Sequence, residues 1–150
     1  RHYEPIIQQA SIFAIFITLI TGTAGNTGTQ SLAVAIRKIG LHEEEQSFWK
    51  VLVQEGTTGL GIGLISGVMV FGIVSLWHGS LVLGGIIGFA MFASIFVAAL
   101  TGTCIPFALE KFNFDPSIAS GPFITTVNDL TSVLVYFTIV SQFISVYLAK

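Results

Sequence analysis

Three long stretches of this 150-residue chain are almost free of charged side chains. Residues 5–36 and 56–109 contain no Asp, Glu, Lys or Arg, and residues 116–149 contain only Asp129. A helix needs about 20 mainly apolar residues to cross the hydrocarbon core of a bilayer. The first and third stretches have room for one such helix each and the second for two. The sequence therefore predicts an all-α membrane protein with four transmembrane helices.

The composition supports this prediction. Hydrophobic residues make up 53% of the chain and charged residues 9%, against roughly 25% charged residues in a soluble domain. The net charge of −2 comes without a basic cluster, so we expect no nucleic-acid partner. Cys104 is the only cysteine, which excludes an intrachain disulfide and a thiolate metal cluster. The chain begins at Arg1 without an initiator Met, and we expect it to be part of a longer protein.

The predicted spans cover residues 5–36, 57–76, 81–105 and 116–148, and we expect a single membrane domain over residues 1–150. In the second span, glycines recur every fourth residue, which is typical of a helix that packs closely against a neighbour. The third span should end at a proline, and in the fourth a Gly-Pro pair should interrupt the helix shortly after its start.

The first span contains the small and polar run T-G-T-A-G-N-T-G-T-Q-S, residues 21–31. In a bilayer, irregular backbone is tolerated only where it is buried in protein or lines water. The run therefore predicts a kinked or broken helix with Asn26, Thr29 and Gln30 directed inward. Close packing of a neighbouring helix against the small residues is the alternative.

The polar connection after the first span predicts a short amphipathic helix at the membrane interface, over residues 43–55. Residues 37–55 and 110–115 should lie on the same side of the membrane, and together they contain four Lys and Arg residues. The opposite side contains two, Arg1 and Lys150. This excess of positive charge places both connections in the cytoplasm.

Asp129 is the residue that most needs an explanation. An ionised carboxylate at the centre of a bilayer costs at least about 2.5–3.5 kcal/mol, so it normally faces a cavity, an ion path or a partner. Helical spacing places polar side chains along one stripe with it: Pro122, Thr125, Thr126, Ser132 and Tyr136. A polar stripe at membrane depth is expected to face a pore or another helix.

A divalent cation suits this pattern. Mg²⁺ prefers oxygen ligands and retains several waters, but one Asp per chain is too few for a site. A two-fold dimer would supply two carboxylates, with hydroxyls and carbonyls of residues 25–30 and 121–125 bonded to the hydration shell. A purely structural Asp129, in a non-conducting or sensing module, stays open. An enzyme is not expected, because a G-x-S-x-G motif, a second membrane carboxylate and a histidine within a span are all absent from the sequence.

Two segments resemble a known family. I-T-G-T-A-G-N-T-G-T-Q-S, residues 20–31, is similar to the second membrane helix of MgtE magnesium channels, and D-P-S-I-A-S-G-P-F-I-T-T-V-N-D, residues 115–129, resembles their fifth. The segment from Thr103 to Pro106 is also similar. The spacing of these blocks fits the family over essentially the whole chain.

The resemblance implies a homodimeric channel in the plasma or inner membrane, with Mg²⁺ as the bound and transported ion. It implies that Asp129 is the central ion-site residue and holds Mg²⁺ mostly through water. The first and last spans would line the pore, with Thr29, Ala33, Gly121 and Thr125 flanking the site. Asn26, directed inward from the first span, would also lie along the pore. Selectivity could extend to manganese, cobalt or nickel. The family's membrane domain has five helices, so the first would be missing here together with the N-terminal cytosolic regulatory domains.

Overall fold

The computed structural model describes residues 4–41, 47–119 and 121–148, and side chains within residues 11–41, 47–119 and 121–143. In these residues the chain forms four long α-helices and one short 3-10 helix: α1 (Glu4–Gly40), α2 (Phe48–His78), α3 (Leu81–Lys111), η1 (Pro116–Ala119) and α4 (Pro122–Leu148). Each of the four long helices contains a segment that is long and apolar enough to cross a membrane. The prediction of an all-α chain with four spans is confirmed.

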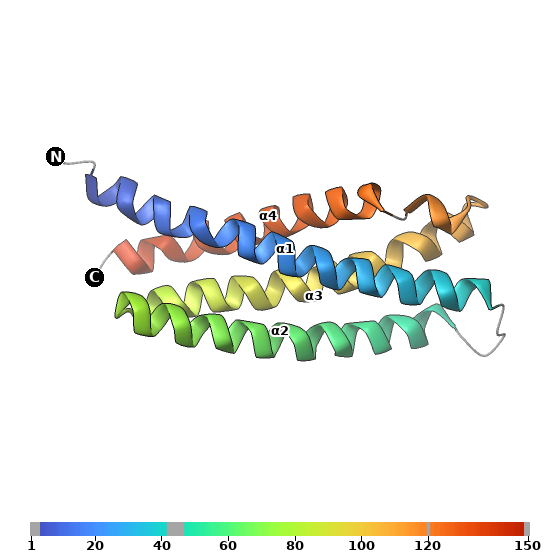
Figure 1. The fold of residues 1–150 in the computed structure, drawn as a ribbon, viewed down its shortest axis with the longest axis horizontal. Helices are drawn as coiled ribbons and strands as arrows, with labels where there is room; N and C mark the ends of the chain where they lie inside the picture. Colours follow the sequence, from blue (N-terminus) through green and yellow to red (C-terminus); the bar gives the residue numbers. More distant parts are fainter. Residues whose placement is uncertain (1–3, 42–46, 120, 149–150) are drawn as a thin grey trace.

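The four helices form one elongated bundle in which α3 packs against each of the other three (Figure 1). Helix α1 also packs along α4 but hardly touches α2. Helix α1 ends, α2 begins and α3 ends at one end of the bundle, and η1 lies there too (Figure 1). The described parts of the two connections, residues 37–41, 47–55 and 110–115, therefore lie on the same side, as expected.

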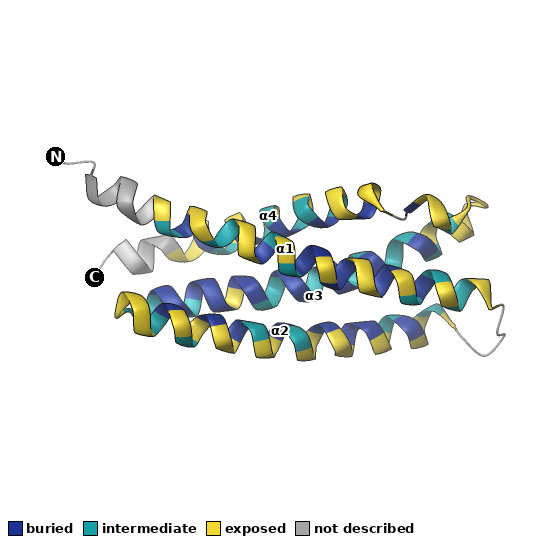
Figure 2. Ribbon diagram, viewed as in Figure 1, coloured by how far each residue is buried: buried dark blue, intermediate teal, exposed yellow. Residues whose placement is uncertain are grey.

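The outer face of α2 is apolar, as a lipid-exposed surface requires. Buried residues follow the sides on which the helices meet, and exposed residues face outward (Figure 2). On α2 the exposed side chains include Leu64, Ile65, Val68 and Met69. Trp77, at the end of this helix, is 80% exposed, a position typical of an aromatic side chain at the membrane surface.

The predicted break in the first span is wrong, because α1 is one continuous 37-residue helix. Its threonines remain compatible with the helix by donating their hydroxyl hydrogens to carbonyls one turn earlier. Thr23 donates to Leu19 (2.8 Å), Thr27 to Thr23 (3.1 Å) and Thr29 to Gly25 (2.8 Å). The alternative interpretation is the correct one: Gly25 and Gly28 in this run allow close contact with α4.

Two predicted boundaries also differ from the structure. Residues 48–55 form the first two turns of α2, not a separate interfacial helix, and residues 43–46 lie outside the described part of the chain. Helix α3 continues past Pro106 to Lys111. A proline inside a membrane helix is tolerated where neighbouring structure accommodates the carbonyl it leaves free. Pro106 is buried within the bundle.

The predicted Gly-Pro interruption is confirmed. Gly121 has a φ of +64°, a left-handed conformation that ends η1 and allows α4 to begin at Pro122. The Asp115 carboxylate accepts the backbone N–H of Ser117 at 2.9 Å. This hydrogen bond lowers the pKa of Asp115 below its ordinary value and caps the first turn of η1.

Glycines bring α2 and α3 into backbone contact. A Cβ added at Gly67 would lie 2.8 Å from the Gly88 carbonyl oxygen, and one added at Gly88 would lie 2.7 Å from that of Gly67. Gly63 meets the Phe92 carbonyl oxygen in the same way, at 3.0 Å. The close packing that the glycine spacing predicted is therefore present, between α2 and α3.

We predict that Gly67→Ala destabilises the bundle by roughly 1–3 kcal/mol, because the added methyl has to separate two backbones. Gly72→Ala on the same helix is the matched control, since a Cβ at Gly72 meets nothing within 4 Å. Reversible unfolding in detergent micelles measures both variants. Equal stability of the two would contradict the contact between α2 and α3.

Candidate functional site

Helix α4 is oriented by a buried face with residues four positions apart: Ile124, Asn128, Ser132, Tyr136 and Val140. The Ser94 hydroxyl of α3 donates to the Ser132 carbonyl oxygen at 3.4 Å, and the Tyr136 hydroxyl donates to the Phe13 carbonyl oxygen of α1. Ser132 and Tyr136 therefore pack inside the bundle, so this part of the predicted polar stripe faces other helices, the second of the two expectations for it.

Asp129 and Thr125 lie beside this buried face and border a hollow of about 260 Å³ between α1 and α4. The other lining residues all come from α1: Thr18, Thr21, Gly22, Gly25, Asn26 and Thr29. Asn26, Thr29 and Thr125 are exposed and Asp129 is half-buried. The carboxylate is thus accessible from outside the single chain while lying against the bundle.

Gly25 allows this approach. A Cβ at position 25 would lie 3.3 Å from the Asp129 Oδ1 atom, which is closer than most such contacts. The glycine therefore removes the side chain that would separate the carboxylate from the backbone of α1. Asp129 lies two helical turns into α4, about 10 Å from its start.

The threonines of the hollow present oxygen lone pairs. Thr29 donates its hydroxyl hydrogen to the Gly25 carbonyl oxygen (2.8 Å), Thr125 to that of Gly121 (3.2 Å) and Thr21 to that of Ile17 (2.9 Å). A carbonyl oxygen can only accept, so each hydroxyl hydrogen is used within its own helix. The lone pairs of the hydroxyl oxygens remain available to accept hydrogen bonds. Water molecules bound to a cation would be suitable donors.

The structure brings Asp129 together with three of the residues singled out from the sequence, Asn26, Thr29 and Thr125. Ala33 and Gly121 are exposed but do not line the hollow. Gly121 contributes through its carbonyl oxygen, which accepts the Thr125 hydroxyl. Gln30, expected to point inward, is exposed and does not line the hollow either.

Sequence reasoning missed Thr18, Thr21 and Gly22. A signal for them was present, since the six lining residues of α1 are spaced by three, four, seven, eight and eleven positions from Thr18. This is the spacing of one face of a helix. Expecting a break at residues 21–31 concealed the pattern, because a broken helix has no continuous face.

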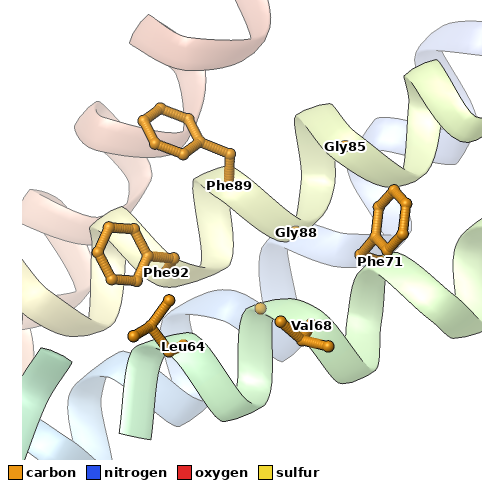
Figure 3. Close-up of a pocket in the computed structure, with 8 residues that line it drawn as sticks. Leu64, Val68, Phe71, Gly85, Gly88, Phe89 and Phe92 are labelled. Atoms are coloured by element: carbon orange, nitrogen blue, oxygen red, sulfur yellow. The ribbon is translucent and has the colours of Figure 1, made fainter. Parts of the chain in front are cut away.

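One chain supplies a single carboxylate here. In the described ranges, no group of three or more His, Cys, Asp or Glu side chains is arranged to hold a metal ion. A second hollow of about 310 Å³ lies between α2 and α3, and its lining includes three glycines. Phe71, Phe89 and Phe92 lie around it (Figure 3). Its lining contains no polar side chain, so it offers a cation nothing.

The polar hollow lies in the part of the chain that matches a known family. The family model for MgtE, described as a divalent cation transporter, matches residues 17–139. The chain belongs to the MgtE family. This match includes every residue that lines the hollow.

Three relatives share the name "Magnesium transporter MgtE". The chain is 51% identical to the Enterococcus faecalis protein over 143 residues, 95% of this chain. It is 38% identical to the Bacillus subtilis protein over 146 residues, also 95% of the chain, and 30% identical to the Thermus thermophilus protein over 138 residues, 91% of the chain. These matches span 32%, 32% and 30% of the relatives' lengths, so the chain covers about a third of each.

Proposed function

We propose that this chain forms the ion-conducting part of a magnesium transporter and that Asp129 binds Mg²⁺ largely through its hydration shell. The observation that carries the proposal is the Asp129 carboxylate, the one carboxylate among the residues that line the hollow, with hydroxyl lone pairs around it. The names of the relatives support magnesium as the ion. Because the chain covers about a third of those relatives, the activity is proposed for the complete protein.

Size and chemistry both favour a hydrated ion. Mg²⁺ binds six oxygens and gives up its waters reluctantly. The hollow measures about 260 Å³ and is open on one side, so it has room for a cation that keeps several of its waters. Water bound to Mg²⁺ donates hydrogen bonds, and the hydroxyl oxygens of Thr29 and Thr125 have lone pairs to accept them.

The charge of the site favours a dimer. A single carboxylate neutralises half of the charge of a divalent cation, and a second copy related by a two-fold axis would supply the other half. The exposed Asn26, Thr29 and Thr125 leave the hollow open on the side where such a copy would lie. We propose that two chains face each other across this surface, with one Asp129 from each.

We place the protein in the plasma or inner membrane with residues 37–55 and 110–115 in the cytoplasm. The bundle geometry supports a common side for these connections (Figure 1), and their Lys and Arg residues support the cytoplasmic orientation. Asp129 is then nearer to the cytoplasmic end of α4 than to its other end.

We predict that Asp129→Asn lowers Mg²⁺ flux into proteoliposomes at least tenfold, because removing a charge partner of a metal site typically costs 10- to 100-fold or more. Asp115→Asn makes the same chemical change at an exposed position outside the spans and should leave the flux unchanged. Unchanged flux with a lower unfolding temperature for Asp129→Asn would assign the carboxylate a structural role. If Asp129→Asn lowered the flux of Mn²⁺, Co²⁺ and Ni²⁺ as much as that of Mg²⁺, the path would conduct divalent cations more broadly.

We also predict that Thr125→Val raises the Mg²⁺ concentration for half-maximal flux about three- to tenfold, corresponding to one lost hydrogen bond of roughly 1 kcal/mol. Thr125→Ser should keep the wild-type value. Thr126→Val is the matched control, because the Thr126 hydroxyl donates to the Pro122 carbonyl oxygen at 2.8 Å and does not line the hollow. Similar shifts for Thr125→Val and Thr126→Val would argue against the site.

A further inference from the structure

Asn128 is the least expected side chain in the bundle core. It is completely buried, and neither its Oδ1 nor its Nδ2 atom has a hydrogen-bond partner among the described residues. A buried amide normally has at least one. No hydrogen bond accounts for an amide at this position, so its contribution in this structure has to come from what it touches.

It touches Gly28 of α1. A Cβ at Gly28 would lie 2.6 Å from the Asn128 Cγ and 2.9 Å from its Oδ1, and it would collide with the Nδ2 atom. The three terminal atoms of the amide thus fill the space that any side chain at position 28 would need. One turn earlier, Gly25 receives the Asp129 carboxylate in the same manner. Two consecutive side chains of α4 therefore lie on two glycines of one face of α1.

Gly28 cannot move away from this contact, because α3 holds it from another side. A Cβ at Gly102 would collide with the Gly28 carbonyl oxygen and would lie 3.0 Å and 3.1 Å from the Gly28 carbonyl carbon and Cα. The α1 backbone at Gly28 is thus enclosed between α3 and Asn128 of α4. Asn128 rests on a fixed support.

We propose that Asn128 is a positioning residue: by resting on Gly28, it fixes the rotation and depth of α4 and holds the neighbouring Asp129 carboxylate in the hollow. Successive residues of a helix point about 100° apart, so the contact of Asn128 with α1 determines where Asp129 points. The inference rests on the proposed role of Asp129 as the ion-binding residue.

The test is a compensation experiment in the complete protein. Gly28→Ala inserts a methyl group where the amide lies, and it should displace α4 and raise the half-saturating Mg²⁺ concentration roughly tenfold, as for loss of an outer-shell partner. Asn128→Ala removes the three atoms that would collide with that methyl group. In the double variant the half-saturating Mg²⁺ concentration should therefore return to within about threefold of the wild-type value, so that about half of the logarithmic change caused by Gly28→Ala is recovered.

Gly61→Ala is the control for adding a methyl group to a membrane helix, because a Cβ there meets nothing within 4 Å. It should leave half-saturation unchanged. Half-saturation is used as the readout because it does not depend on the amount of folded protein. Unfolding temperature and the yield of folded protein are measured on the same samples and report the effect of each variant on stability separately. If Gly28→Ala does not fold alone, a folded and active double variant still supports the contact.

Two results would overturn the inference. One is a Gly28→Ala variant with reduced stability and unchanged half-saturation, which would make the contact mere packing. The other is a double variant that Asn128→Ala fails to rescue. Failure of the proposed function gives a different result. The Asp129→Asn variant would then have the wild-type half-saturating Mg²⁺ concentration, whatever the result for the variants at positions 28 and 128.

Discussion

Close contact between helix backbones at glycines is the interaction on which this bundle depends. Lipid supplies no hydrophobic force that drives helices together, so packing and hydrogen bonds between them have to do so. Gly67 and Gly88 bring α2 and α3 together, and Gly102 brings α3 against Gly28 of α1. Helix α3, which packs against every other helix, is thereby fixed in the centre, and α1 and α4 are left on one side with a polar surface.

That polar surface has to present oxygen atoms in the membrane and also has to leave no backbone group without a hydrogen bond. Irregular backbone would expose ion-binding carbonyls but would leave polar groups unsatisfied in lipid. Here α1 stays fully helical, and its threonines satisfy their hydroxyl hydrogens within the helix while their lone pairs remain available. Glycines at the same face let the Asp129 carboxylate approach. The site is therefore built from side chains on two regular helices.

Predictions that rested on composition and spacing were mostly correct. The charge-free stretches identified four spans, the glycine spacing in the second span indicated its packing face, and Gly121-Pro122 marked the start of α4. The predictions of a break at residues 21–31 and of a helix end at Pro106 failed for one reason. Glycine, threonine and proline disfavour helices in water, but in a bilayer each backbone group left unpaired costs several kcal/mol, and the helix therefore continues.

The sequence by itself determined that this chain has four stretches able to span a membrane and that Asp129 is the one charged residue between positions 116 and 149. Because a carboxylate in hydrocarbon is costly, the sequence also indicates that Asp129 has a polar environment. Only the tertiary structure decided which polar residues accompany it. Thr125 lines the hollow, and Ser132 lies inside the bundle. That division depends on the rotation of α4 against α1, where Asn128 packs on Gly28 and Gly28 in turn packs on Gly102 of α3.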